Sequence, residues 1–524
     1  MNKINIKKVK NVKNDYLRDE SRKIGRAKTI SFPESEQEVI EILKYMYKNK
    51  MPVTVQGART GISGGASPEE GHILNLSKLN KITGFRYNQE EESFYLKVQP
   101  GVILSQIRKF LNTVELETDN WSRDSIKAYQ ILKKSRPYFF PPDPTEASAS
   151  IGGMVACNAS GSRSFSYGST RKYVEELKVI LINGDSFTLK RGQQKVKNRK
   201  FLLNLESGKK LKGILPEYKM PRVKNTAGLF VKENMDLIDL FIGSEGILGV
   251  ITDITIKLIP DPQNKWGITV FFNGENKAVK FVRGLRNEIS EYRIDRLPVA
   301  IEFFNQDSLN LLKNQKDIKV PEFPAEINTA IYLELHGNSN DELYNNMLSI
   351  TKLIEACGGK KENSWVAQNK QDRERLGEFR HAVPEAVNSI IDKRKKENPE
   401  LTKLGTDMAV PDRYLNQVLQ MYNSSLRREG MDSVIFGHIG DNHLHVNILP
   451  RNLQEYHRGE DLYREWAEKI IKMDGTISAE HGVGKLKVDL LKKMLGKEQI
   501  KQLKELKKVF DKDMLLNPGT VIVN

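Results

Sequence analysis

The amino-acid sequence is poor in cysteine, with only Cys157 and Cys357 among its 524 residues. Two thiols cannot build a disulfide framework, and they cannot supply a zinc or iron–sulfur site made of several cysteines. The sequence also lacks an apolar run of about 18 residues, the length needed to span a bilayer, and its basic N-terminus lacks the apolar core of a secretory signal. We therefore predict a cytoplasmic protein without a transmembrane segment, for which peripheral membrane contact stays open.

Negative charge is in the minority, because 67 Asp and Glu stand against 83 Lys and Arg, for a net charge of +16. Such a surplus attracts nucleic acids, anionic membrane surfaces, acidic partners or anionic substrates. Nucleic-acid binding would require a recognised module, or aromatic residues interleaved with a basic stripe, and the sequence shows neither. We expect solvated basic faces, with local excesses at 186–225 and near the C-terminus, and no nucleic-acid partner. A basic nucleic-acid-binding protein is kept as the alternative from another class.

The length fits two large domains or three smaller ones, since domains usually hold about 100–200 residues. The turn Pro260-Asp261-Pro262 follows a strand-like run and marks the expected boundary. We predict a polar lead-in at 1–25, a first domain at 26–261 and a second domain at 262–524. The closing part of the second domain, 485–524, is expected to pack back on the first.

Local patterns predict an α+β protein rather than a repeated βαβ array. Ser35 and Glu38 form a capping box ahead of apolar residues at helical spacing, which predicts a helix ending near Lys50. Strands are expected at 52–55, 72–76, 93–98, 177–182, 249–256, 266–272 and 329–335, and further helices at 276–290 and 340–357. The last helix is basic and amphipathic, with Ile500, Leu503, Leu506, Val509 and Phe510 on one face. Such a face packs on a protein core more often than on a membrane.

Three glycine-rich segments lie in the first domain. The first, 56–66, follows a strand and can direct several backbone N–H groups at one anion. It matches neither Gly-x-Gly-x-x-Gly nor the P-loop, which disfavours a Rossmann fold or a nucleotide hydrolase. The second joins Pro-Pro-Asp-Pro at 141–144 to the small residues of 151–161, against which a flat ligand can lie. The third is Gly-Ser-Glu-Gly at 243–246. Each segment alone is also compatible with an ordinary turn or packing seam.

Together, in this order and spacing, the three segments resemble the FAD-binding domain of the vanillyl-alcohol oxidase (PCMH-type) flavoprotein superfamily. The resemblance covers 26–261 and implies a two-subdomain fold with one FAD deep between its halves. The first segment would hold the diphosphate, the second would lie along the isoalloxazine and ribityl, and the third would lie near the other end of the cofactor. The FAD-binding residues implied in this way are Gly57, Ala58, Arg59, Thr60, Gly61, Gly64, Gly65, Pro142, Thr145, Ser148, Gly152, Gly153, Asn158, Ser160, Gly161, Glu245, Gly246, Val250 and Ile251.

Covalent members of this superfamily bond the flavin through a histidine of the first loop. The corresponding residue here is Arg59, and no histidine precedes His72 in the sequence. The resemblance therefore implies a non-covalent FAD.

Histidines are concentrated in the second domain, where His438, His443, His445, His457 and His481 lie within one short stretch. His443 and His445 would point to the same face of a strand. Two imidazoles and one carboxylate form a divalent-cation set that leaves coordination positions open for substrate, and a neighbouring histidine can act as a base. A hydrogen-bonded structural cluster is the alternative. Read singly, His443 and His457 are interpreted as packing or surface residues.

From Pro260 to the closing Asn-Pro-Gly at 517–519, the chain resembles the substrate domain of the FAD-linked D-lactate, glycolate and D-2-hydroxyglutarate dehydrogenase family. The family implies an α+β (ferredoxin-like) cap domain with a helical C-terminal segment. It implies metal ligands at His438, His445 and Glu480, for which zinc is favoured and manganese and iron are also suited.

The same resemblance implies three residues that act on the substrate. His481 would take the hydroxyl proton, Asn447 would hydrogen-bond the substrate, and Arg380 would clamp its carboxylate. For Arg380 the alternative is a helix-surface arginine in an ion pair.

The sequence departs from the family at several positions. The usual Gly-Asp-Gly-Asn-x-His reads Gly-Asp-Asn-His-Leu-His at 440–445. The hydroxyglutarate enzymes carry a Thr and a Lys where this chain has Pro384 and Gly405. Contacts to a second, distal carboxylate are weakened by these changes, which favours a monocarboxylate such as D-lactate. Glycolate and bulkier 2-hydroxy acids stay open.

The resemblance thus predicts an FAD-dependent dehydrogenase that oxidises a D-2-hydroxy acid to the 2-oxo acid, with metal-assisted deprotonation and hydride transfer to flavin N5. Two cysteines cannot hold a cluster that relays electrons, so we expect a separate acceptor: a quinone, an electron-transferring flavoprotein, an iron–sulfur protein or oxygen. The alternatives are a glycolate or D-2-hydroxyglutarate dehydrogenase, the flavin subunit of an electron-transfer complex, and a metal-only hydrolase, which leaves the glycine segments unexplained. A homo-oligomer is expected.

Overall fold

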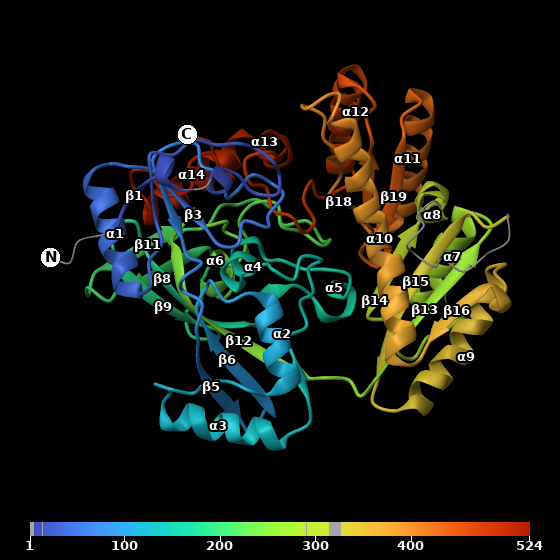
Figure 1. Cartoon of the computed structure of the whole chain (residues 1–524), viewed down its shortest axis with the longest axis horizontal. Coiled ribbons are helices and arrows are strands. Elements are labelled where there is room, and N and C mark those ends of the chain that lie inside the picture. Colours follow the sequence, from blue (N-terminus) through green and yellow to red (C-terminus); the bar gives the residue numbers. More distant parts are fainter. Residues whose placement is uncertain (1–4, 13, 290, 314–325, 524) are drawn as a thin grey trace.

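The computed structural model of the chain describes residues 5–12, 14–289, 291–313 and 326–523. Mixed helices and sheets make up the fold, which confirms the predicted class. Three larger sheets are present: two belong to the half drawn in blue and green in Figure 1, and the third to the half drawn in yellow and orange. The chain passes from one half to the other between Pro260 and Asn264, where the sequence predicts a boundary.

The first sheet carries the first glycine-rich segment. Its order is β1 (Lys7–Lys8), β2 (Thr29–Ser31), β4 (His72–Asn75) and β3 (Val53–Gln56), with β2, β4 and β3 parallel. Helix α1 (Glu36–Lys48) connects β2 to β3 and buries Val39, Leu43 and Met46 against the sheet. Ser35 caps α1 because its hydroxyl accepts the N–H of Glu38, as predicted, while the Glu38 carboxylate accepts the N–H of Glu34.

The second sheet is antiparallel, and several helices share a core cluster with it. Its order is β5 (Ile82–Asn88), β6 (Ser93–Val98), β12 (Val250–Pro260), β8 (Val174–Ile180) and β9 (Ser186–Lys190), and β7 (Tyr138–Phe139) pairs with the end of β12. The associated helices are α2 (Leu104–Thr113), α3 (Arg123–Lys134), α4 (Ile151–Cys157), α5 (Ser164–Tyr167) and α6 (Ile238–Phe241). The basic segment 186–225 contains β9 and a separate hairpin of β10 (Lys200–Asn204) and β11 (Lys210–Ile214).

The third sheet is also antiparallel. Its order is β16 (Ser364–Ala367), β13 (Asn264–Phe272), β15 (Thr329–Gly337), β14 (Ala300–Phe304), β19 (Ser433–Gly437), β20 (His443–Ile448) and β17 (Leu404–Gly405), with β18 (Met408–Ala409) also paired to β20. Side chains alternate between its faces. Ile268 and Val270 pack with α7 (Glu275–Leu285) and α9 (Asn340–Ala356), whereas Phe271 packs with α8 (Gln306–Lys313) and α10 (Lys370–Arg394). Each face is therefore covered by helices.

The C-terminal helices divide between the two halves of the molecule. Helices α11 (Leu415–Glu429) and α12 (Leu453–Lys472) pack together beside the third sheet, whereas α13 (Val488–Leu495) and α14 (Lys497–Phe510) lie on the blue and green half (Figure 1). Leu503, Leu506 and Phe510 of α14 are buried. The Phe510 ring stacks on Phe201 of β10 and meets Phe241 edge-on. The apolar face of α14 is thus part of the core.

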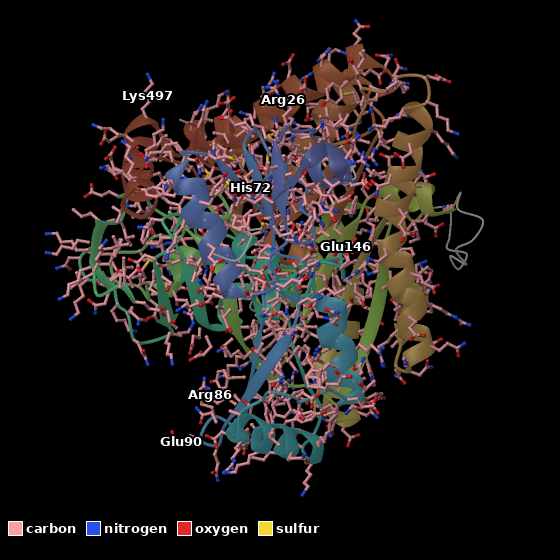
Figure 2. The ribbon with its side chains drawn as sticks, turned by 60° about the vertical axis from the view of Figure 1, so that its left-hand side comes forward. Arg26, His72, Arg86, Glu90, Glu146 and Lys497 are labelled. Carbon is pink, nitrogen blue, oxygen red and sulfur yellow. The ribbon has the colours of Figure 1, made fainter. Side chains whose placement is uncertain are left out.

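Charged side chains occupy the outside of the molecule. Arg86, Glu90 and Lys497 are exposed, and nitrogen and oxygen tips alternate around the outline of Figure 2. Several lysines are paired with acids on the same or a neighbouring helix, such as Lys469 with Glu465. Within the described part of the chain, no helix combines the length and the apolar character of a membrane span.

The blue strands contain one buried histidine that is held on both sides. His72 of β4 places Nδ1 at 2.9 Å from the Thr29 hydroxyl and Nε2 at 2.8 Å from the Ser31 hydroxyl, and Figure 2 labels it well inside the ribbon. Burial lowers the pKa of His72 to about 3. Because the unfolded chain binds this proton near pH 6.5 and the folded chain does not, the fold loses stability as the pH falls from 6.5 toward 3.

We expect His72→Gln to remove this part of the acid sensitivity. Each pH unit below the unfolded pKa costs about 1.4 kcal/mol, so the wild type should lose about 2 kcal/mol more than the variant between about pH 6.5 and about pH 5. Urea unfolding across this range measures the difference. His457→Gln, at an exposed histidine of α12, is the control. An equal acid sensitivity in wild type and His72→Gln would contradict the prediction.

Candidate active site

A cavity of about 320 Å³ lies where the three glycine-rich segments meet. Residues 57–63, 65 and 66 after β3 line it, together with α4 and its flanking residues and the start of β12. Glu480 and His481 of the other half also line it. The cavity therefore joins the predicted cofactor site to the predicted metal site.

Most residues that the flavoprotein resemblance implies lie on the wall of this cavity. They are Gly57, Ala58, Arg59, Thr60, Gly61, Gly65, Thr145, Gly152, Gly153, Ser160, Glu245, Gly246 and Ile251. Gly64, Pro142, Ser148, Asn158, Gly161 and Val250 are absent from the described cavity wall. A direct role in cofactor binding stays a prediction for both groups.

Packing accounts for several residues off the wall. Val250 belongs to the apolar cluster under α1, because it points to the opposite face of β12 from Ile251. Asn158 ends α4 in the left-handed conformation, and its side-chain oxygen accepts the N–H of Arg171 at 2.9 Å. A Cβ at Gly161 would lie 2.0 Å from the Asp143 carbonyl oxygen, so this glycine permits a close backbone approach.

The first glycine-rich loop is packed on one side and open on the other. A Cβ at Gly57 would lie 2.2 Å from the Ser150 hydroxyl oxygen, and that hydroxyl accepts the N–H of Ala58 at 3.3 Å. A Cβ at Gly61 would meet no described atom within 4 Å. The open side of the loop is thus a concave backbone surface that a side chain would fill. A bound diphosphate fits such a surface.

Arg59 is the residue that the resemblance matches to the flavin-bonding histidine of covalent flavoproteins. It adopts φ of +63°, and its guanidinium lies 4.4 Å from the centre of the Tyr16 ring. Its backbone carbonyl accepts the N–H of Glu20. The residue therefore joins the lead-in to the loop.

Asp19 and Asn517 are among the residues of the cavity wall that sequence reasoning missed. Asp19, in the lead-in, is buried and accepts the N–H of Ala66 at 3.2 Å; no sequence pattern announces it. Asn517 accepts the N–H of Val55 at 2.7 Å and donates to the Glu245 carbonyl at 2.6 Å. Because Asn517 belongs to the closing Asn-Pro-Gly motif, its place at the site could have been predicted from the sequence.

Glu245 connects the third glycine-rich segment to the predicted metal site. It is buried at φ of +51°, and its carboxylate oxygens accept the N–H groups of Val483 and Gly484 at 2.7 and 2.8 Å. Burial raises the pKa of Glu245 to about 7. The turn that carries Glu480 and His481 is therefore anchored in the first half of the molecule.

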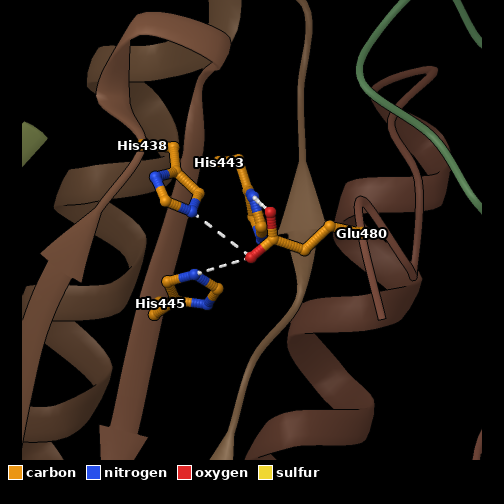
Figure 3. A group of neighbouring side chains, drawn as sticks. All are labelled: His438, His443, His445 and Glu480. Atoms are coloured by element: carbon orange, nitrogen blue, oxygen red, sulfur yellow. Dashed lines mark hydrogen bonds and ion pairs between the residues drawn. The ribbon is translucent and has the colours of Figure 1, made fainter. Parts of the chain in front are cut away.

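The predicted metal ligands meet at one carboxylate oxygen (Figure 3). Nε2 of His438 lies 3.3 Å, and Nε2 of His445 3.4 Å, from Oε1 of Glu480. With His443, these residues offer four ligand atoms that all lie within 4.8 Å of one another. The donor set of imidazoles and one carboxylate suits a first-row divalent metal.

Acceptors behind the imidazoles orient their rings. Nδ1 of His438 lies 2.6 Å from Glu302 Oε1, and Nδ1 of His445 lies 3.1 Å from the Thr406 carbonyl. Each ring therefore directs Nε2 at Glu480, as second partners do for metal-bound histidines. Burial opposes the charge on His438, yet Glu302 and Glu480 raise its pKa to about 10. Glu302 and Thr406 were not found from the sequence, since they lie on distant elements.

His443 differs from its interpretation as a simple packing residue. It shares a face of β20 with His445, as strand alternation predicts, and it is fully buried. Its Nδ1 lies 4.0 Å from Glu480 Oε2, and its Nε2 lies 3.1 Å from Asp407 Oδ1. His443 therefore belongs to the cluster, whereas His457 is an exposed residue beside Glu460.

The basic segment 186–225 ends in the site. Lys224 is buried and donates to Glu480 Oε2 at 2.6 Å, and its Nζ lies 4.0 Å from Asp441. Burial opposes the charge, but Glu480 and Asp441 raise the pKa of Lys224. Sequence reasoning missed this lysine because it is one of many in a basic stretch.

Asp407 organises the turn that carries Glu480 and His481. It is fully buried, and its carboxylate accepts the N–H groups of both residues at 3.1 Å and the Lys487 ammonium at 2.5 Å. Burial opposes ionisation, but His481 and Lys487 hold the pKa of Asp407 well below its usual value. Nδ1 of His481 lies 3.4 Å from Asp407 Oδ2, and its ring stacks on that of His445.

Arg380 and Asn447 flank the cluster on α10 and β20. The guanidinium of Arg380 donates to the Ser162 hydroxyl and lies 3.1 Å from Nε2 of His381. Burial opposes its charge, but Glu302 and Asp143 raise the pKa of Arg380. No carboxylate in the described residues lies at ion-pair distance, so the surface-pair alternative has no support. Asn447 is buried and shares the strand face of His445.

A second set of polar contacts joins the first half of the molecule to the second half near the site. The Arg163 guanidinium binds the Glu334 carboxylate with two atoms, at 3.0 and 2.7 Å. His336 lies 2.8 Å from the same carboxylate and 2.7 Å from the Tyr167 hydroxyl. Arg163 directly follows Ser162, so this ion pair also positions the partner of Arg380.

Two sequence families match the chain. The family described as FAD binding domain matches residues 27–123 and 127–190. The family described as FAD linked oxidases, C-terminal domain, matches residues 262–521.

Similar curated proteins span nearly the whole chain. The glycolate oxidase subunit GlcD of Bacillus subtilis (strain 168) is 29% identical, over 93% of this chain and 87% of its own length. A D-lactate dehydrogenase of Anaerostipes hadrus is 28% identical over 97% and 93%. A D-2-hydroxyglutarate dehydrogenase of Stutzerimonas stutzeri (strain A1501) is 24% identical over 97% and 94%. Among solved structures, p-cresol methylhydroxylase with substrate bound matches with a TM-score of 0.63 at 15% identity, over 95% of this chain and 89% of that one, which shows the fold.

The two family matches and the glycine-lined cavity therefore define an FAD-dependent oxidoreductase, whose fold is shared with p-cresol methylhydroxylase. Within that class, the chain belongs to the FAD-linked oxidase family.

The open side of the first loop gives a test of the cofactor site. Gly61→Val would place its side chain where no described atom lies within 4 Å, on the wall of the cavity. We expect FAD affinity to fall at least about tenfold, since the loop backbone can no longer approach the cofactor closely. The melting temperature of the apoprotein should not change. Flavin fluorescence titration measures the affinity.

Gly274→Val is the matched control, because a Cβ there also meets no described atom within 4 Å but lies at the start of α7, away from the described cavity wall. Unchanged FAD affinity in Gly61→Val would contradict the assignment of this loop.

Proposed function

We propose that the protein oxidises a D-2-hydroxy acid, with D-lactate favoured, to the 2-oxo acid, using non-covalent FAD and a divalent metal. The observation that carries this proposal is the shared cavity: Glu480 and His481 line the same space as the glycine-rich segments. The names of the relatives, which act on glycolate, D-lactate and D-2-hydroxyglutarate, support the substrate class.

The cofactors and the chain have separate tasks. Hydride acceptance from the substrate Cα is the chemistry that FAD supplies when bound, and a lowered hydroxyl pKa is what a divalent metal supplies. His438, His445 and Glu480 would hold that metal through the atoms that now converge. The ammonium of Lys224 would balance the negative charge on the second Glu480 oxygen and hold that oxygen in place. The protein contributes position and charge.

His481 is the proposed base for the substrate hydroxyl. Its Nδ1 lies beside Asp407 and its Nε2 lies 3.5 Å from Glu480 Oε1, on the metal side. An N–H at Nδ1 directed to the Asp407 carboxylate leaves the Nε2 lone pair available for the proton. His481 also lines the cavity, so this atom can reach a substrate next to the flavin site.

Arg380 and Asn447 are the proposed substrate-positioning residues. A carboxylate bound by Arg380 would fix the Cα–H toward the cavity. Gly405 of β17 supports a monocarboxylate, since it offers no cationic side chain for a second carboxylate, and a Cβ there would lie a tight 3.0 Å from Asn447 Oδ1. Pro384, one helical turn after Arg380, offers no hydroxyl for a second carboxylate.

Electrons would leave through a separate acceptor. Cys157 lies on the cavity wall and Cys357 is buried under α9, so the described chain brings no pair of cysteines together for a redox group. A quinone, an electron-transferring flavoprotein, an iron–sulfur protein and oxygen are the proposed acceptors.

Anaerobic flavin bleaching tests the substrate and the base together. D-lactate should reduce the bound flavin faster than glycolate or D-2-hydroxyglutarate at equal concentration. His481→Gln should keep FAD and slow the reduction by about 10²–10⁴-fold, because a positioned general base contributes that much. Stopped-flow absorbance at the flavin band measures the rate, and His457→Gln is the control. Bleaching at the wild-type rate in His481→Gln would refute its assignment as the base.

Removal of metal tests the second cofactor. After dialysis against a chelator, the protein should keep FAD but reduce it at least about a hundredfold more slowly with D-lactate. Added zinc, manganese or ferrous iron should restore the rate in the wild type and not in Glu480→Gln. A metal-free protein that keeps full activity would show that the cluster is structural.

A further inference from the structure

We propose that His443 is a further metal ligand, so that three imidazoles and the Glu480 carboxylate hold the cation. This inference rests on the proposed metal site and defines its composition. The family resemblance implies only His438, His445 and Glu480 as ligands, and the family pattern has Asn at the position of His443.

The distances place His443 in the same coordination space. Ligand atoms of His438, His443, His445 and Glu480 lie within 4.8 Å of one another. The His443 ring centre is 4.4 Å from that of His445 and 5.4 Å from that of His438. Nδ1 of His443 faces the second Glu480 oxygen at 4.0 Å (Figure 3).

The three imidazoles are arranged in the same way. Each has one nitrogen beside an acceptor outside the cluster: Glu302 for His438, the Thr406 carbonyl for His445, and Asp407 for His443. The other nitrogen of each ring is directed at Glu480. An outer carboxylate or carbonyl behind an imidazole is the usual support of a metal-bound histidine.

The surroundings of His443 disfavour a purely structural role. The side chain is fully buried, and neither ring nitrogen makes a well-directed hydrogen bond with the described residues. The 3.1 Å contact with Asp407 has the length of an ion pair but does not have the geometry of a hydrogen bond. Buried polar atoms without such bonds are rare because they lose their solvation. A metal at Nδ1 would give that nitrogen a partner, while Nε2 keeps its contact with Asp407.

A fourth protein ligand reduces the number of coordination positions that are left for the substrate. Four donors would close a tetrahedral site, whereas substrate binding needs open positions. A cation held by these four residues would therefore need more than four coordination positions in order to take a substrate as well. Three imidazoles also select against magnesium and calcium, which prefer oxygen ligands.

The test uses the full chain with FAD bound, stripped of metal by a chelator and reloaded with Co²⁺ alone. X-ray absorption at the cobalt edge counts bound imidazoles, and titration gives the Co²⁺ dissociation constant. We expect three imidazoles in the wild type, and two in His443→Asn with affinity at least about tenfold weaker. His457→Asn, which makes the same substitution at an exposed site, should match the wild type.

The outcomes separate this inference from the proposed function. Two imidazoles in the wild type, or an unchanged count and affinity in His443→Asn, overturn the role of His443. The proposed site survives that result if His438→Ala and Glu480→Gln still abolish Co²⁺ binding. A wild type that binds no Co²⁺ overturns both. If His443→Asn does not fold, the number of imidazoles bound to Co²⁺ in the wild type decides the question: three support the role of His443 and two overturn it.

Discussion

The buried carboxylate of Glu480 is the constraint on which the site depends. A charge removed from water must be balanced by neighbours of opposite sign or by hydrogen bonds. Lys224 and Ser160 from the first half and the imidazoles from the second half all converge on its two oxygens. Donors from both halves thus surround the two oxygens of one carboxylate. The contacts that define the chemistry of the site therefore also set the position of one half relative to the other. Asp407, behind it, holds the backbone of the turn in the required shape.

The cofactor cavity and the metal cluster are therefore parts of one framework. Glu245 belongs to the glycine-rich wall of the cavity, yet its carboxylate holds Val483 and Gly484 in the turn after His481. Ser63, in the first glycine loop, donates to the His481 carbonyl at 3.0 Å. Arg163 and Glu334 add a charged contact beside the Arg380 partner Ser162. The turn that carries His481 is therefore held directly on the cavity wall.

The sequence allowed the fold and the outline of the site to be predicted, because both depend on local spacing. Glycine loops after strands, the capping box at Ser35, and His443 and His445 on one strand face are patterns within a few residues. The partners that complete the site are long-range: Asp19, Glu302 and Lys224 are remote in sequence from the residues they contact. Lys224 could not be separated from the other lysines of its segment, and His443 was undervalued because it was judged apart from the ring of donors that surrounds it.

The C-terminal segment has a consequence for the order in which the protein matures. Leu515 accepts the N–H of Val53, Asn517 donates its N–H back to the Val53 carbonyl, and the buried Lys507–Asp511 pair fixes this segment beside β3. Asn517 also lines the cavity. Asn517 is thus synthesised after the entire second half, while the glycine loops that line the same cavity emerge from the ribosome early. A chain that stopped before Asn517 would lack part of the cavity wall.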